Sequence, residues 1–269
     1  MKYKQNLHTH TTFCDGKDTP GEMVQFAIRK GFDSLGFSSH AYEPHFPVKN
    51  MLDPTRYKEE ITQLKEKYRG VIDIFLGLEM DALSEADMSG YDYLIGSVHN
   101  LKKGSDIIPF DRSAAEVKQQ VDQYFGGDGM AFARLYYQQL AELPRCGDFD
   151  IIGHFDIITK NIDFVPLFDP NSEEYLSLAF EAIHALKGHI PFFELNTGAI
   201  ARGYRKTPYP TIPLLKEFRR LGFGAVISSD CHNGNFLDCY FDEAKDLLLS
   251  CGFREQYVLT AKGFQAIEL

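Results

Sequence analysis

Apolar runs rich in β-branched and aromatic residues alternate with amphipathic segments along almost the whole chain. Seven such runs end near residues 8, 40, 79, 99, 154, 196 and 230. Between them, apolar residues recur at helical spacing, which predicts helices over about 20–30, 54–68, 114–125, 130–143, 173–187, 214–221 and 237–251. Regular alternation of strands and helices predicts an α/β fold with parallel strands, organised as one closed or nearly closed barrel of seven units.

Local signals mark several of the predicted boundaries. Thr19-Pro20-Gly21-Glu22 is a capping box with Pro at the first helical position, and the glycines of 126–129 separate two helices. Residues 41–53, 101–112 and 197–213 are predicted to be loops, and the chain after 251 is predicted to be a short tail. We find no low-complexity linker and no internal repeat, and therefore expect a single domain over 1–269.

Histidines follow the predicted strands with unusual regularity. Two further runs end in Glu79 and Asn196, which are also capable of binding metals. Because the carboxyl ends of successive parallel strands meet at one face of a barrel, these side chains should converge there. The six histidines found where an apolar run ends are His8, His10, His40, His99, His154 and His232.

The segment from Leu7 to Gly16 contains the densest group of potential ligands. In a strand, side chains two residues apart project to the same face, so His8 and His10 can reach one ion together. Asp15 then returns from the following loop. This stretch therefore predicts a metal site at the end of the first strand.

Nine donors are expected at the open face: the six histidines with Asp15, Glu79 and Asp230. One ion rarely takes more than four to six protein ligands, so the set indicates at least two metals and allows three. Mixed imidazole and carboxylate donors suit Zn, Mn or Fe better than Mg or Ca. Glu79, flanked by histidines, is the candidate bridging ligand.

Net charge, apolar content and cysteine spacing limit the classes of partner that we expect for this protein. The formal net charge of −10 disfavours nucleic acid, although a local cationic site could still hold a small phosphate. No segment approaches the ~18 apolar residues of a membrane span, so we expect a soluble, cytoplasmic protein with no membrane partner. The five cysteines form no C-x-x-C pair and are expected to be reduced thiols that do not bind metal, although Cys14 and Cys231 neighbour proposed ligands.

Several metals close together suit the hydrolysis of phosphate esters. Such metals can share a hydroxide that is nucleophilic at neutral pH and can neutralise phosphoryl charge. An amidohydrolase would use a similar face, but no lysine ends a strand, and Lys160 lies six residues beyond His154. Arg202, Arg205 and Lys206 in the loop after strand six, with Lys160, are the candidate phosphate contacts.

Taken together, the motifs resemble the PHP (polymerase and histidinol phosphatase) superfamily over essentially the whole chain. They are His8-Thr-His10, Asp15-Gly16, Ser39-His40, Gly77-Leu-Glu79, Gly96-Ser-Val-His99, Gly153-His154 and Ser229-Asp230-Cys-His232. The chain is most similar to the stand-alone histidinol-phosphatase branch through Tyr124-Phe-Gly-Gly-Asp128, Tyr136-Tyr137, Asp150-Ile-Ile-Gly-His154, Asn196-Thr-Gly and Arg205-Lys-Thr-Pro-Tyr-Pro210.

The resemblance implies a distorted (βα)7 barrel, here a single PHP domain over 1–269, with a trinuclear centre. Glu79, Asp230 and His232 are the residues to which we assign catalytic roles. The implied reaction, in histidine biosynthesis, is hydrolysis of L-histidinol phosphate to L-histidinol and phosphate by a metal-bridging hydroxide. The implied ligand sets are His8, His10, Glu79 and Asp230 for one metal, Glu79, His99 and His154 for a second, and Asp15, His40 and His232 for a third.

The cationic end of that substrate needs its own contacts. Glu43, with Phe13 or Tyr42 as an aromatic wall, is the candidate. Three alternatives stay open: a PHP phosphoesterase acting on a phosphotyrosyl protein, a sugar phosphate or a nucleotide; an amidohydrolase-like enzyme acting on C–N bonds; and a non-catalytic metal-binding module. The oligomeric state is not legible from the sequence.

Overall fold

Seven parallel strands form the central sheet of the computed structural model, which describes residues 3–44 and 51–269. Neighbouring strands follow the order of the chain, and the ends of the sheet meet through a parallel bridge between Thr9 and Cys231. The predicted seven-stranded α/β barrel is therefore confirmed. Its strands are β1 (Gln5–Asn6), β2 (Ser34–Phe37), β3 (Asp73–Asp81), β4 (Tyr93–Ser97), β7 (Ile151–Ile152), β8 (Phe192–Asn196) and β9 (Gly224–Ser228).

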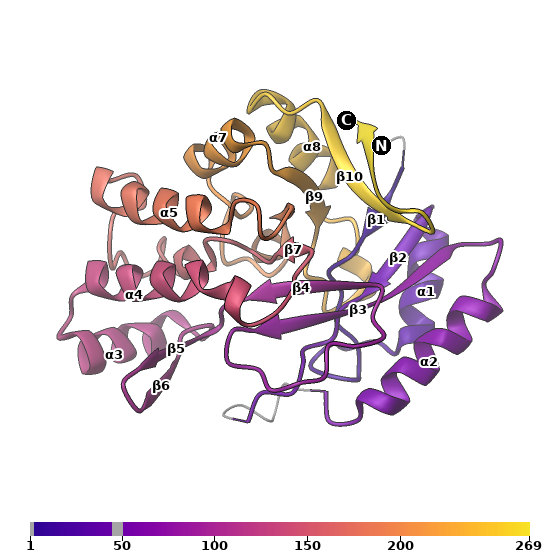
Figure 1. Ribbon diagram of the computed structural model, residues 1–269, viewed down its shortest axis with the longest axis horizontal. Helices are drawn as coiled ribbons and strands as arrows, with labels where there is room; N and C mark the ends of the chain where they lie inside the picture. The colour runs from indigo at the N-terminus through magenta and orange to yellow at the C-terminus, as the bar shows by residue number, and fades with distance from the viewer. Residues whose placement is uncertain (1–2, 45–50) are drawn as a thin grey trace.

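Helices cover the outside of the barrel (Figure 1), close to where the apolar spacing predicts them. Thr19 and Glu22 form the predicted capping box at the start of the first helix. In the described part of the chain, no helix is long and apolar enough to cross a membrane. The helices are α1 (Pro20–Arg29), α2 (Pro54–Lys67), α3 (Ala114–Phe125), α4 (Gly129–Ala141), α5 (Glu173–Leu186), α6 (Gly198–Ala201), α7 (Ile212–Leu221) and α8 (Phe241–Ser250).

Strand alternation decides which side chains enter the barrel. In β3, Phe75 packs in the barrel interior, whereas Leu76 and Leu78 pack in the larger core shared with the helices. Glu79 has the parity of Phe75, so its carboxylate points inward at the carboxyl end of the strand. The apolar layer beneath it contains Leu7, Phe75, Tyr93, Ile95, Ile151, Val226 and Leu259.

Three segments differ from the predictions, and one of them is the predicted loop 197–213, which contains the short helix α6 and the start of α7. The predicted loop 101–112 contains a hairpin of β5 (Asn100–Lys103) and β6 (Asp106–Pro109), which turns at Gly104 with φ 64°. The predicted tail forms a second hairpin, β10 (Glu255–Thr260) and β11 (Gly263–Glu268). Its Leu259 backbone exchanges two hydrogen bonds with the Gln5 amide, so the hairpin caps the amino-terminal end of the barrel. The predicted loop 41–53 lies partly outside the described residues.

Candidate metal centre

All nine predicted donors lie together at the carboxyl ends of the barrel strands, in a cup that we define by these nine residues. They form four overlapping groups whose potential ligand atoms lie within 4.8 Å of one another. These groups are His10 with Asp15, His40 and His232; His8 with His10 and Asp230; His8 with Glu79 and His154; and His40 with Glu79 and His99. The structure therefore brings the predicted residues into one site.

Glu79 occupies the middle of the cup. Its Oε2 lies 3.2 Å from His8 Nε2, 3.4 Å from His10 Nε2 and 2.8 Å from His40 Nδ1. Its Oε1 lies 3.3 Å from His99 Nε2 and 3.1 Å from His154 Nε2. Because each carboxylate oxygen faces a different set of imidazoles, Glu79 has the geometry of a bridging ligand.

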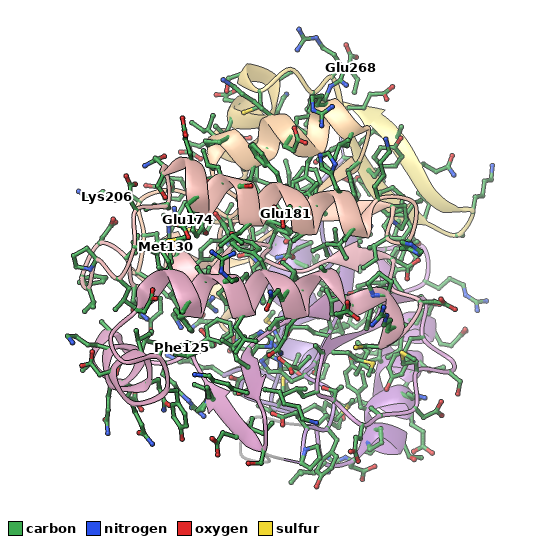
Figure 2. The ribbon with its side chains drawn as sticks, turned by 60° about the vertical axis from the view of Figure 1, so that its left-hand side comes forward. Phe125, Met130, Glu174, Glu181, Lys206 and Glu268 are labelled. Carbon is green, nitrogen blue, oxygen red and sulfur yellow. The ribbon has the colours of Figure 1, made fainter. Side chains whose placement is uncertain are left out.

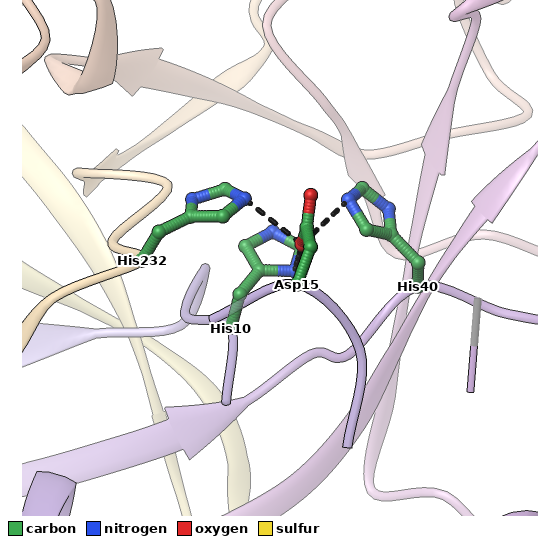
Figure 3. Close-up of side chains that lie close together, drawn as sticks. All are labelled: His10, Asp15, His40 and His232. Atoms are coloured by element: carbon green, nitrogen blue, oxygen red, sulfur yellow. Dashed lines mark ion pairs between the residues drawn. The ribbon is translucent and has the colours of Figure 1, made fainter. Parts of the chain in front are cut away.

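Asp15 returns to the cup from the loop after β1. Figure 3 shows its carboxylate between His40 and His232, above His10. Asp15 Oδ1 lies 3.1 Å from His232 Nε2 and 3.5 Å from His40 Nε2. The next residue must be glycine, because a Cβ at Gly16 would lie 2.4 Å from the backbone of His10.

Asp230 enters from the end of β9 with an unusual backbone. Its φ of 46° is in the left-handed region, which is strained for a residue with a side chain. Its Oδ1 lies 3.1 Å from His10 Nε2 and 3.6 Å from His8 Nε2. Its Oδ2 accepts a hydrogen bond of 2.7 Å from Arg202, which fixes the carboxylate from the outside.

The donors in the cup fit divalent cations. Among the described residues, His8 Nε2, His10 Nε2 and Glu79 Oε2 are buried and make no hydrogen bond. Leaving such a group without a partner costs about 1–3 kcal/mol each. A cation that accepts electron pairs from imidazole and carboxylate would satisfy all three atoms at once.

Electrostatics keep the carboxylates of the cup ionised. Burial alone would raise the pKa of the Glu79 carboxyl, but His8 and His40 hold that pKa well below its usual value. Burial would likewise raise the pKa of the Asp230 carboxyl, but Arg202 and His8 hold that pKa well below its usual value. Burial and the neighbouring His232 and His40 lower the pKa of His10 to about 3, so its imidazole is neutral. Despite burial, the surrounding carboxylates raise the pKa of His8 and that of His99 well above the usual value, so a cation that binds there displaces a proton from each imidazole.

Neither neighbouring cysteine joins a ligand group in the described chain. Burial raises the pKa of Cys14 to about 11 and that of Cys231 to about 12, which disfavours the thiolate. Cys14 Sγ lies 3.4 Å from His10 Nδ1, and Cys231 donates to the carbonyl of Asn233. Cys14 is half-buried and Cys231 is buried, and each lies beside a proposed ligand.

Three polar residues that support the cup are absent from the sequence-based set. Ser97 donates to Glu79 Oε1 over 2.8 Å. Asp81 accepts from the backbone N–H of His99 and lies 3.3 Å from its Nδ1. Glu194 accepts from His8 Nδ1 over 2.9 Å. Ser97 and Glu194 are polar residues inside apolar strand runs, and Asp81 is the last residue of β3, two positions after Glu79.

Two cavities adjoin the cup and share His40, His99 and Asp111. The first, which we call the Glu43 cavity, is also lined by Glu43, Asp81 and Asn100. The second, which we call the Arg202 cavity, is also lined by Lys17, Lys160, Arg202 and Tyr204. The first cavity has four carboxylates and one arginine, Arg112, in its lining, whereas the second has three cations together with the carboxylates of Asp15, Asp111 and Asp230.

The predicted substrate contacts separate in the structure. Lys160 and Arg202 line one cavity and Glu43 lines the other. Arg205 and Phe13 line neither. Arg205 donates to the hydroxyls of Thr159 and Thr207, and the Phe13 ring packs 5.3 Å from that of Tyr57. Lys206 is exposed and projects from the outer surface (Figure 2).

A parallel α/β barrel with clustered imidazole and carboxylate donors at its carboxyl end defines a class of metal-dependent hydrolases. The model of the PHP domain family matches residues 6–198, which is more than two thirds of the chain. The chain belongs to the PHP domain family.

Similarity to individual proteins extends over most of this chain. The histidinol-phosphatase of Bacillus subtilis (strain 168) is 27% identical over 259 residues, covering 85% of this chain and 93% of that protein. The histidinol-phosphatase of Lactococcus lactis subsp. lactis is 26% identical over 271 residues, covering 94% and 93%. A crystal structure of histidinol phosphate phosphatase from Lactococcus lactis, complexed with zinc, L-histidinol and phosphate, superposes with a TM-score of 0.71 at 23% identity, covering 97% of this chain and 98% of that one.

Proposed function

We propose that this protein hydrolyses L-histidinol phosphate to L-histidinol and phosphate, using two or three divalent metal ions of the Zn, Mn or Fe type. The observation that carries the proposal is the pair of Glu79 oxygens, which have five imidazole nitrogens within 3.4 Å. Whole-length similarity to two histidinol-phosphatases supports the substrate. In the reaction water adds to phosphorus, the P–O ester bond breaks, and the alcohol oxygen takes up a proton.

The nine cup residues would hold the ions, with Glu79 between them. Divalent ions bound there supply positive charge to the phosphoryl oxygens and activate the attacking water. Glu79, Asp230 and His232 are the residues to which we assign catalytic roles as ligands beside the substrate. Asp230 is fixed for this role by Arg202, whose guanidinium donates to both its carboxylate and its carbonyl.

Lys160 and Arg202 are the proposed phosphate contacts. A phosphate monoester carries a dianionic end, and guanidinium and ammonium groups donate charge-assisted hydrogen bonds to its oxygens. Lys160 Nζ lies 2.6 Å from Asp111 Oδ1, and Asp111 lines both cavities. The Arg202 side chain retains 31% of its exposure, so part of its guanidinium faces the Arg202 cavity.

Glu43 is the proposed contact for the cationic amine. Its side chain is buried, and Asn100 donates to its Oε2 over 3.0 Å. Asp81 and Asp111 line the same cavity and add negative charge. A substrate with a phosphate at one end and an ammonium group at the other matches this pair of cavities, because Lys17, Lys160 and Arg202 line one and mostly carboxylates line the other.

A panel of phosphomonoesters tests the function. Purified protein loaded with zinc or manganese should release phosphate from L-histidinol phosphate with a kcat/KM well above that for phosphotyrosine, glucose 6-phosphate and a nucleoside monophosphate. Equal or greater turnover of another ester would assign the same site to a different substrate. Activity confined to a cyclic amide would overturn the phosphatase proposal.

Elemental analysis tests the cofactor. Protein purified without added metal and then titrated with zinc should bind more than one ion per chain. Replacement of His99 by Ala should lower that stoichiometry, because it removes a ligand on the Oε1 side of Glu79. A stoichiometry of one in wild-type protein would contradict a multinuclear centre.

A further inference from the structure

Glu194 is a buried carboxylate beneath the cup that has no place in the ligand set. It lies in the middle of β8, its exposed fraction is 1%, and it belongs to no group of potential ligands among the described residues. Four donors surround its two oxygens. Oε1 accepts from the backbone N–H of His154 over 2.5 Å and from the Asn196 amide over 2.7 Å. Oε2 accepts from His8 Nδ1 over 2.9 Å and from the Ser228 hydroxyl over 2.5 Å.

The contact with His8 determines which nitrogen faces the cup. An ionised carboxylate only accepts hydrogen bonds, so the His8 nitrogen beside it must carry the proton. Nδ1 therefore holds the hydrogen, and the lone pair of a neutral His8 is on Nε2. That atom lies 3.2 Å from Glu79 Oε2 and makes no hydrogen bond of its own. The imidazole is thus presented in the tautomer that binds a cation through Nε2.

The same carboxylate also fixes a second strand end. His154 follows β7, and its backbone N–H donates to Glu194 Oε1 while its Nε2 points at Glu79 Oε1. Ser228 and Asn196 connect the carboxylate to the ends of β9 and β8. One side chain therefore holds His8 and His154, which lie on opposite oxygens of the bridging glutamate.

We infer that Glu194 is a positioning residue that fixes the tautomer of His8 and the backbone of His154, and so controls metal affinity on both sides of Glu79 without contacting an ion. The inference rests on the metal set of the proposed function but not on its substrate. Removing a carboxylate that orients a ligating histidine typically weakens metal binding by about 10- to 100-fold.

Glu194→Gln is the sharpest test because it keeps the shape of the side chain and converts one acceptor into a donor. An amide nitrogen at the Oε2 position would face His8 Nδ1–H and force the proton onto Nε2, which blocks the ligand. An amide nitrogen at the Oε1 position would face the His154 N–H instead. Neither orientation of the amide satisfies all four donors.

The experiment compares zinc affinity, measured by competition with a chromophoric chelator, in wild-type and Glu194→Gln protein. We expect a loss of about 10- to 100-fold in affinity, with unchanged far-UV circular dichroism. Glu217→Gln is the matched control, because Glu217 is also buried and also bonds a histidine, His184, over 2.6 Å, but lies outside the cup. Zinc affinity equal to wild type in Glu194→Gln would overturn the inference.

A second measurement is made on wild-type protein and needs a variant only to assign the signal. In zinc-loaded wild-type protein with ¹⁵N-labelled histidine, His8 should show an exchange-protected proton on Nδ1, assigned by its loss in His8→Asn. A His8 that binds zinc through Nδ1 would contradict the assigned tautomer. Because both readouts use zinc alone, wild-type protein that binds zinc but leaves histidinol phosphate intact would overturn the proposed function and not this inference.

Discussion

In the described part of the chain, two clusters that combine histidine, glutamate and arginine can be compared, and the one in the cup resembles a metal centre. Between α5 and α7, Glu217 bonds His184 over 2.6 Å and Arg220 over 2.6 Å, so its charge is matched by adjacent donors. In the cup, the two oxygens of Glu79 face five imidazole nitrogens, and several buried atoms make no hydrogen bond. Residue types alone therefore do not define a metal site. A metal site is defined by several potential ligand atoms that converge on one point and have no hydrogen-bond partner.

Glu79→Gln should have the largest effect and would break the comparison most directly. Loss of the bridging carboxylate removes the group shared by both sides of the cup, so we expect kcat for phosphate release to fall on the order of 10³-fold and bound metal to decrease. Steady-state phosphate release and elemental analysis measure the two effects. Retention of both in Glu79→Gln would show that the cup is organised around another residue.

Removal of metal should have the second-largest effect on activity. Dialysis against a chelator should abolish hydrolysis, and zinc or manganese should restore it. Zinc at about 100 times its dissociation constant should stabilise the fold by about 2.7 kcal/mol, measured as a rise in the midpoint of thermal unfolding. His184→Ala should show the same rise as wild type because that histidine lies outside the cup. Full activity in metal-free protein would contradict the proposed role of the cup.

Glu43→Gln should affect substrate discrimination rather than metal binding. Loss of a hydrogen bond to a charged group costs about 1.5–3 kcal/mol, which predicts a KM for L-histidinol phosphate that is higher by roughly tenfold to a hundredfold. The KM for phenyl phosphate, which has no amine, should not change. A parallel rise for both esters would indicate that Glu43 supports the cup and does not recognise the amine.

Glu217→Gln should have the smallest effect and sharpens the contrast. Arg220 and His184 lower the pKa of the Glu217 carboxyl to about 2. A lowered pKa in the folded protein stabilises it above the unfolded value of about 4.3, and this contribution is lost as pH falls toward 2. We expect a loss of about 0.5 kcal/mol at pH 7, shrinking below pH 4, measured by urea unfolding. Metal content and kcat should match wild type.

The strand ends could be predicted from the sequence because each apolar run stops at a polar residue of the barrel rim. Seven runs and their order are enough to fix a parallel barrel, and the barrel brings distant residues such as His8 and Asp230 to one face. The two hairpins were missed for different reasons. The β5–β6 segment is too polar to stand out from a loop, and the alternation of β10–β11 follows the last expected helix.

The roles of side chains that lie in loops, or that contact a ligand instead of an ion, were harder to predict from the sequence. Arg202 and Arg205 are three residues apart in one loop, yet only Arg202 lines a cavity beside the cup. The difference depends on a short helix, α6, and on the bond from Arg205 to Thr159, which sequence spacing does not reveal. Glu194 lies inside the apolar run that ends at Asn196, and an acidic residue in a buried strand needs polar partners that the run itself does not reveal.

The bridge between Thr9 and Cys231 links the beginning of the barrel to its last strand. His10 N–H donates to the Cys231 carbonyl, and Cys231 N–H donates to the His8 carbonyl. During synthesis on the ribosome, His8 and His10 emerge long before Asp230 and His232. A nascent chain therefore holds only part of the donor set until β9 docks beside β1, and we expect it to bind ions tightly only after that step.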